Sequence, residues 1–343
     1  MPKVSVVVAV YNVAQFIEQS LRCLLEQTLE DVEFVIVDDC TPDDSMEILA
    51  RVAAEYPQRK SRLKIIRHDV NQGVAVTKND GIRAAEGEYV IILDPDDYFE
   101  RDMLSILYER AAESDADMAI CDYYKVSSER KKRGTVVPNK PIENGLNVRD
   151  DIINRESDGF MMIRLVRRSI YQQPGFLWPV GRFAEDIVYS TITAYYSKKI
   201  VYVDQPLYYY VQHQGSLVHG FTEEKTLMIV ESLMANIDII IQFLKNEGCE
   251  DKYWLGILRQ KLRARNRLLP LARSRKYRKM WFRIYPELNK ILFWGDEKYH
   301  SSYKEKLWFF VMYFGLYAKL RNRLSKPKYR PWPQWSVWPV NNK

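Results

Sequence analysis

Three aspartates within four residues are the feature of this sequence that could most directly do chemistry. Asp94, Asp96 and Asp97 follow the apolar run at residues 89–93 without a break. Carboxylates so close together repel one another unless a cation or several hydrogen-bond donors compensate their charge. A hard divalent ion is the usual solution, bound through one or two carboxylates and the phosphate oxygens of a substrate. We therefore predict a metal role for this cluster.

Two further acidic pairs stand beside elements that the sequence predicts. Asp38 and Asp39 end the apolar run 32–37, and Glu185 and Asp186 precede a helical pattern. Each pair also has a structural interpretation, because Asp caps helices and turns and acidic residues suit a helix N-terminus. Taken alone, neither pair distinguishes catalysis from capping.

The elements that must position these residues alternate regularly. Short apolar, mostly β-branched runs predict buried strands, and the segments between them carry apolar residues at helical spacing. The predicted strands are 3–10, 32–37, 63–66, 89–93 and 118–123, and the predicted helices include 14–29, one capped by Asp43 or Asp44, 74–85 and 103–112. Strands alternating with helices predict parallel pairing covered on both faces. The first half is therefore expected to be a doubly wound α/β domain, whose ligands bind beyond the carboxyl ends of the strands.

Several classes of function are disfavoured. Neither a G-x-G-x-x-G nor a G-x-x-x-x-G-K-[ST] loop follows the first strand, which weighs against a dinucleotide or P-loop site. The four cysteines are far apart, without a C-x-x-C pair, so neither a zinc knuckle nor a disulfide framework is indicated. The four histidines are isolated, and structural or surface roles are expected for them.

The motifs together resemble a known family. SVVVAVYN at 5–12, VDD at 37–39, NQGVAVTKNDGIRAAEGEYVIILDPDD at 71–97 and AED at 184–186 are similar to family 2 glycosyltransferases of the GT-A fold. The resemblance covers about the first 220 residues in the right order and spacing. It implies a mostly parallel GT-A sheet, followed here by a helical, basic C-terminal extension.

The resemblance also implies donor-site roles. Tyr11 would pack against the base of a nucleotide-sugar, and Asp39 would accept a hydrogen bond from the uracil ring N–H. Lys78 and Asn79 match positions that line the donor pocket.

The same resemblance assigns the metal and the base. Asp94 would contact ribose or metal, and Asp96 would coordinate Mg²⁺ or Mn²⁺ bridging the diphosphate. Asp186 matches the catalytic base, so a single displacement with inversion is expected.

Two departures from the family pattern refine this expectation. No Q-x-x-R-W motif stands downstream, which favours a transferase that adds one sugar over a processive synthase. Many relatives carry an arginine near Tyr210, whereas this chain reads Val211-Gln212-His213-Gln214, which leaves His213 or a later basic residue to assist the leaving group.

Charge is divided unequally along the chain. Residues 259–343 hold 22 basic and four acidic residues, net +18, while the rest carries a net charge of −12. The aromatic run at 307–317, with basic neighbours, predicts a segment lying on an anionic membrane surface, although packing as ordinary core is the alternative. Nucleic acid is a less suitable partner. No export signal and no run of about 18 apolar residues is visible, so we expect a cytoplasmic protein on the inner face of the plasma membrane.

The domain organisation expected from these patterns has three parts. Residues 1–125 form a nucleotide-sugar-binding half, 126–220 an acceptor-side half carrying the base, and 221–343 a helical, basic, aromatic extension. The expected activity is metal-dependent transfer of one sugar from a UDP-sugar to a hydroxyl of a polysaccharide or lipid-linked oligosaccharide. A sugar-phosphate nucleotidyltransferase and a non-catalytic membrane- or nucleic-acid-binding scaffold are the alternatives.

Overall fold

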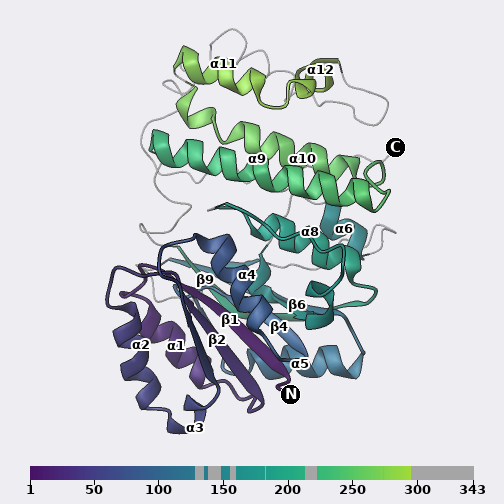
Figure 1. Cartoon of the computed structure of the whole chain (residues 1–343). Helices are drawn as coiled ribbons and strands as arrows, with labels where there is room; N and C mark the ends of the chain where they lie inside the picture. The colour runs from purple at the N-terminus through teal and green to yellow at the C-terminus, as the bar shows by residue number, and fades with distance from the viewer. Residues whose placement is uncertain are drawn as a thin grey trace.

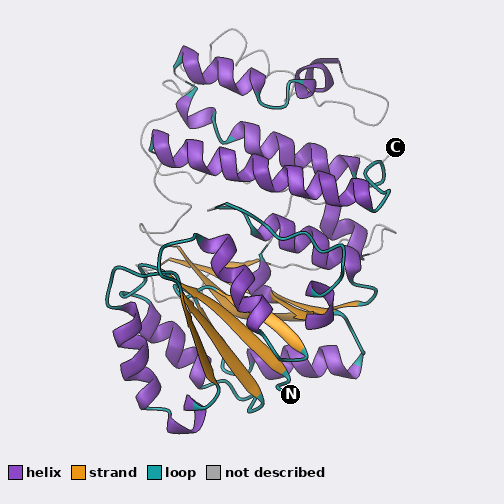
Figure 2. Ribbon diagram, viewed as in Figure 1, coloured by secondary structure: helices purple, strands orange, loops and turns teal. Residues whose placement is uncertain are grey.

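The computed structural model describes residues 1–127, 135–137, 148–154, 160–181, 183–212, 222–272 and 274–294. An α/β body containing one twisted sheet lies at the N-terminal end, and helices cover both faces of the sheet (Figures 1 and 2). Helices of the C-terminal region stack in layers beyond the edge where the first strands end (Figure 1).

The sheet contains nine strands in the part of the chain that is described, in the order β3-β2-β1-β4-β8-β6-β9-β5 with β7 beside β6. Their bounds are β1 Val4–Val10, β2 Val32–Asp38, β3 Leu63–Arg67, β4 Tyr89–Leu93, β5 Tyr98–Phe99, β6 Met118–Ser127, β7 Thr135–Val137, β8 Arg164–Arg167 and β9 Ile200–Gln212. The pairs β1–β2, β2–β3, β1–β4 and β6–β9 are parallel. The expected mostly parallel α/β sheet is confirmed.

The helices of the α/β body follow the predicted pattern. They are α1 Ile17–Leu25, α2 Ser45–Ala54, α3 Pro57–Lys60, α4 Val74–Ala84, α5 Met103–Glu113, α6 Val148–Asn154, α7 Arg168–Tyr171 and α8 Asp186–Tyr196. Helix α4 packs on β1 and β2, and α5 packs on β6 and β9. Gly81 makes the first of these contacts possible, because a Cβ there would lie 2.4 Å from Cγ1 of Val7. This close approach fixes α4, which carries Lys78 and Asn79, against the sheet.

Apolar side chains hold the sheet and its helices together. β2 is buried along its whole length and β1 almost so, as their β-branched runs predict for strands covered on both faces. A single core cluster extends from β1 to α10, so the expected halves 1–125 and 126–220 share one sheet and one core.

Several features of the sheet differ from the pattern expected from the sequence, among them the short strands β5 and β7. β8, which the sequence did not suggest, inserts antiparallel between β4 and β6. Residues 200–212 form one long strand, β9, whose pairing with β6 shifts register near Asp122. A four-residue strand that contains the buried Arg164 carries too little periodicity to stand out.

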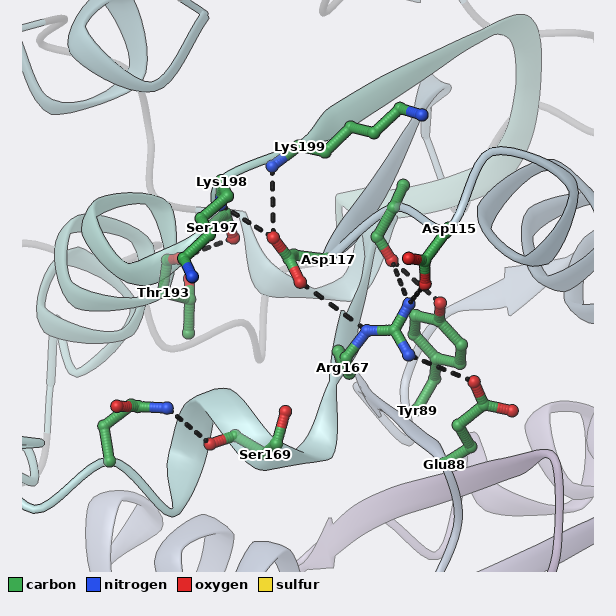
Figure 3. A network of polar contacts seen from close by, with 12 residues as sticks. Glu88, Tyr89, Asp115, Asp117, Arg167, Ser169, Thr193, Ser197, Lys198 and Lys199 are labelled. Carbon is green, nitrogen blue, oxygen red and sulfur yellow. Dashed lines mark hydrogen bonds and ion pairs between the residues drawn. The ribbon is translucent and has the colours of Figure 1, made fainter.

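An ion-pair network fixes β8 beside β4 (Figure 3). The guanidinium of Arg167 lies 2.7 Å from Asp115, 3.2 Å from Glu88 and 3.5 Å from Asp117. It also lies over the ring of Tyr89, at 4.9 Å from the ring centroid. Because Arg167 pairs with the first residue of β4, this network lies at the opposite edge of the sheet from the carboxyl ends of the parallel strands.

The C-terminal helices form a second layer with its own core. They are α9 Glu223–Asn246, α10 Trp254–Asn266, α11 Arg275–Arg283 and α12 Glu287–Trp294. α9 packs on both α8 and α10, and a second apolar cluster around Leu268, Trp281 and Leu288 joins it to α11 and α12.

By length and composition alone, α9 would be long and apolar enough to cross a membrane, and it is the one such helix among the described residues. No unbroken apolar run marks this helix in the sequence, because Glu231 and Asp238 interrupt it. Of its most apolar stretch, 44% is buried against the rest of the protein. A helix in the core of a soluble protein can have the same length and composition.

Candidate active site

Three strand ends bring the predicted donor residues to one edge of the sheet. Val10, the last residue of β1, pairs with Asp38 of β2, and Val8 pairs with Leu93 of β4. Since β1 lies between β2 and β4, Tyr11 is flanked by the two acidic corners that begin at Asp38 and Asp94. Tyr11 is 46% exposed, so its ring is open to a ligand.

Backbone conformation and hydrogen bonds join the first two corners. Asn12, directly after Tyr11, has φ 54°, which is uncommon for a residue with a side chain. Its N–H donates to Oγ1 of Thr41 at 2.8 Å, and the N–H of Ala14 donates to the Asp43 carboxylate at 2.8 Å. Burial raises the pKa of Asp43, but donors that include Ser45 and Ala14 outweigh burial and lower it. The two corners are therefore held as one rigid unit.

Asp39 is buried and already bonded within the protein. Its two oxygens accept from the N–H groups of Gln72 and Gly73 at 2.8 and 2.9 Å, and Oδ1 lies 2.9 Å from Nδ1 of His68. The second ring nitrogen of His68 lies 3.3 Å from Asp80. A carboxylate has about four lone-pair sites, so Asp39 can accept one more hydrogen bond. His68, for which the sequence indicated only a structural or surface role, is thus part of the donor corner.

Lys78 connects the acidic corner after β4 to the acidic pair Glu185 and Asp186 at the start of α8. Its Nζ lies 2.7 Å from Glu185, 3.3 Å from Asp94 and 3.6 Å from Oδ1 of Asp186. The lysine is 4% exposed. One buried cation therefore holds together three carboxylates that come from β4 and from the start of α8.

This cluster sets the protonation of its members. Burial lowers the pKa of Lys78, but attraction to Asp186, Asp94 and Glu185 outweighs burial and raises it well above the usual value. Burial raises the pKa of Asp186 to about 7, with repulsion from Glu185 and Asp94 adding to it and Lys78 opposing it. Lys78 is therefore a fixed positive charge, whereas Asp186 can exchange a proton near neutral pH.

Asp186 has an oxygen without a hydrogen-bond partner. Its Oδ1 is buried and accepts no hydrogen bond, although Lys78 Nζ faces it at 3.6 Å, while the side chain as a whole is 28% exposed. Ala184, two residues earlier, has φ 60°, a strained backbone conformation for alanine. Strained backbone and unsatisfied polar atoms concentrate at functional sites.

The side chains of Asp97 and Asn79, near the site, face the protein interior and are buried. The oxygens of Asp97 accept from the Tyr208 hydroxyl and the Val211 N–H, each at 2.7 Å. The Asn79 amide donates to the Pro179 carbonyl at 3.2 Å and accepts from the Tyr189 hydroxyl at 2.5 Å. Asp97 thus joins β9 to the acidic corner after β4, and Asn79 joins α4 to the segment before α8.

The carboxylates that remain toward solvent suit a hard cation. Asp94 and Asp96 are both partly exposed at the end of β4. In the described ranges no group of three or more His, Cys, Asp or Glu side chains could hold a metal ion. Two carboxylates completed by diphosphate oxygens are a usual Mg²⁺ arrangement, so these residues fit a metal that arrives with its nucleotide.

Comparison with known proteins identifies the family. The glycosyl transferase family 2 model matches residues 5–172, from β1 to just beyond α7. The chain belongs to glycosyl transferase family 2. The class of enzyme expected from the sequence, a glycosyltransferase, is confirmed.

A curated relative agrees with this family, and two solved structures share the fold. The chain is 33% identical over 225 residues to the uncharacterised glycosyltransferase EpsJ of Bacillus subtilis, covering 63% of this chain and 63% of that one. It is similar in fold to S. aureus TarS 1–349 in complex with UDP-GlcNAc, with TM-score 0.63 and 19% identity over 96% and 93% of the two chains. The mannosyltransferase PcManGT from Pyrobaculum calidifontis, in complex with GDP-Man and Mn²⁺, matches with TM-score 0.51 and 18% identity over 95% and 88%.

Some of the expected site residues lie outside the range matched by the family model. Residues 184–186 follow that range, and the structure places Asp186 beside Lys78, which also pairs with Asp94. His213 and the aromatic run 307–317 lie outside the described residues. The sequence did not indicate the contacts of His68 and Glu185. Their partners, Asp39 and Lys78, are 29 and 107 residues away along the chain.

Proposed function

We propose that this glycosyltransferase moves one sugar from a UDP-sugar to a hydroxyl of a glycan or lipid-linked glycan, with inversion at the anomeric carbon. The observation that carries the proposal is the Lys78 cluster, which holds the donor-side carboxylate Asp94 and the base Asp186 around one buried ammonium. A displacement needs both groups close to the reacting carbon, one beside the leaving group and one beside the nucleophile.

The donor is bound by the three strand ends. Tyr11 offers an exposed ring to the uracil face, and Asp39 uses its remaining acceptor capacity for the ring N–H. Asp94 and Asp96 would hold the Mg²⁺ or Mn²⁺ that accompanies the diphosphate. When bound, that ion supplies positive charge that stabilises the departing UDP.

Asp186 acts on the acceptor. As the acceptor oxygen bonds to the anomeric carbon, the bond from that carbon to the phosphate oxygen breaks and its electron pair leaves with UDP. The acceptor proton passes to the Asp186 carboxylate, whose pKa of about 7 lets it accept a proton near neutral pH. Lys78 keeps neighbouring Glu185 and Asp94 paired, so that their charges do not prevent Asp186 from ionising.

The acceptor is proposed to be presented at the inner face of the plasma membrane. The net charge of +18 over residues 259–343 supports attraction to an anionic surface. On α11, Tyr277 and Trp281 face the protein interior, and the exposed residues are Arg275, Lys276, Lys279 and Arg283.

A panel of UDP-, GDP- and dTDP-sugars with Mn²⁺, scored for slow release of the nucleotide by hydrolysis, tests the donor assignment. Release from a UDP-sugar above the others supports it. Release from only GDP- or dTDP-sugars would contradict the assignment of a UDP-sugar as the donor.

A further inference from the structure

Asn236 in the middle of α9 is bonded to the segment that leads to the proposed base. It is fully buried, and its Oδ1 accepts from the N–H of Val180 at 3.1 Å. Its Nδ2 donates to the carbonyl of Phe183 at 3.0 Å. One amide thus bridges two backbone groups three residues apart, the second of them three residues before Asp186.

The chemistry of these two bonds requires an amide. Val180 presents a donor and Phe183 an acceptor, so the bridging side chain must accept at one atom and donate at another. Aspartate, of nearly the same shape, can accept from Val180, but when ionised it faces the Phe183 carbonyl without a proton to donate. Leucine can satisfy neither group, and unpaired buried polar groups are costly.

The backbone that Asn236 contacts is held by α4 as well as by α9. Asn79 on α4 donates to the carbonyl of Pro179, directly before Val180. Gly181 passes so close to α9 that an added Cβ would lie 3.2 Å from Oγ of Ser232, one helical turn before Asn236. Ala184 then holds φ 60° immediately before Glu185. A strained backbone persists only where its surroundings determine it, and here those surroundings include α9.

Helix α9 is itself capped and packed into the core. Its first turn is capped by Thr222, whose hydroxyl accepts from the N–H of Lys225 at 3.2 Å. On either side of Asn236, Leu233 and Ile237 are 1% exposed within the core cluster shared with the sheet. The C-terminal layer is therefore joined to the site through a buried polar contact as well as through apolar packing.

We propose that Asn236 is a positioning residue for glycosyl transfer, acting through the backbone at Val180 and Phe183 to hold Asp186 in line with the acceptor. This inference rests on the proposed function, specifically on Asp186 as the base. It gives the helical extension a part in catalysis that is separate from any attachment to a membrane.

The test compares Asn236→Asp and Asn236→Leu with Asn246→Asp, an exposed asparagine at the end of the same helix. For each full-length variant, UDP affinity is measured by calorimetry, and kcat and KM are measured for release of UDP from the preferred UDP-sugar with Mn²⁺. We expect kcat to fall by roughly tenfold or more in both Asn236 variants, as misplacement of a catalytic group predicts, with UDP affinity within about twofold of the parent. The Asn246 variant should match the parent.

A double variant separates positioning from general stability. If Asn236 acts through Asp186, then Asn236→Asp combined with Asp186→Asn should be no slower than Asp186→Asn alone, whereas independent effects would multiply. If Asn236→Leu fails to fold, the aspartate variant and the double variant still decide. The inference is overturned if the Asn236 variants keep a kcat within twofold of the parent, or if they lose UDP affinity in proportion to kcat. It is also overturned if the effects of Asn236→Asp and Asp186→Asn on kcat multiply in the double variant.

Failure of the proposed function has a different signature. If Asp186→Asn itself releases UDP at the parent rate, then Asp186 is not the base and the inference about Asn236 falls with it. If Asp186→Asn is inactive while both Asn236 variants keep the parent rate, only the positioning role is wrong.

Discussion

Lys78 Nζ lies 2.7 Å from Oε1 of Glu185, a residue 107 positions further along the chain. This contact joins α4, which lies within the range matched by the family model, to the start of α8, which lies outside it. Because Lys78 is buried and also pairs with Asp94, the lysine fixes the separation between Asp94 and Glu185. The geometry of the proposed site therefore depends on a salt bridge in the interior as well as on the strand ends.

Replacing Asp96 with asparagine should abolish most of the metal-dependent part of UDP binding. The substitution removes the negative charge that would hold the ion beside the diphosphate, while the size of the side chain stays nearly the same. Calorimetry with UDP in Mn²⁺ and in EDTA measures the effect, and Asp204→Asn, an exposed aspartate on β9, is the control. Equal affinity of the parent protein in Mn²⁺ and in EDTA would rule out the metal assignment.

Transfer should depend on pH through Asp186. Its pKa is raised to about 7, so the carboxylate that accepts the proton is lost as pH falls through that value. We expect kcat to rise from about pH 5 to a plateau above about pH 8, as for a general base. A profile of kcat that stays flat down to about pH 5 would be incompatible with this base.

Arg167→Gln should lower stability without changing the chemistry. The guanidinium meets Glu88, Asp115 and Asp117 at the edge of the sheet opposite to the site (Figure 3), so its loss should cost on the order of 2 kcal/mol. Urea unfolding measures this difference, with the exposed Arg110→Gln on α5 as the control. A loss of kcat in correctly folded Arg167→Gln would show that the network reaches the site.

Deleting residues 307–343 should release the protein from vesicles that contain anionic lipid while the α/β body still binds UDP. Attraction between exposed basic residues and the surface is screened within about 10 Å at 0.1 M salt, so binding of the full chain should also weaken as salt rises. Co-sedimentation of both forms at low and high salt gives the answer. A truncated chain that is unfolded by circular dichroism would mean that the aromatic run is core packing.

Much of this site could be predicted from the sequence because its parts are local. Each of the strands β1, β2 and β4 is a continuous apolar run ending in its own polar residues, so the strand ends and the corner residues Tyr11, Asp39 and Asp94 followed from period and order. Parallel pairing then places those ends at one edge.

The parts that the sequence did not reveal depend on contacts between distant residues. Nothing near His68 indicates that its ring meets Asp39, and nothing near Asn236 indicates that its amide meets Val180. Asn79 matched a pocket-lining position, yet its amide is bonded to Pro179 and Tyr189. Such pairings are set by how helices pack on the finished sheet, and no local period encodes them.

If Asp186 is the base and takes no part in holding UDP, the loss of its charge should lower the rate of transfer and leave the affinity for UDP unchanged. Both quantities are measured on the same preparation of Asp186→Asn, as release of UDP from the preferred UDP-sugar and as affinity for UDP. We expect UDP affinity near that of the parent, with kcat lower by about 10²- to 10⁴-fold, the range for loss of a general base. A kcat within a few-fold of the parent would contradict the assignment of Asp186 as the base.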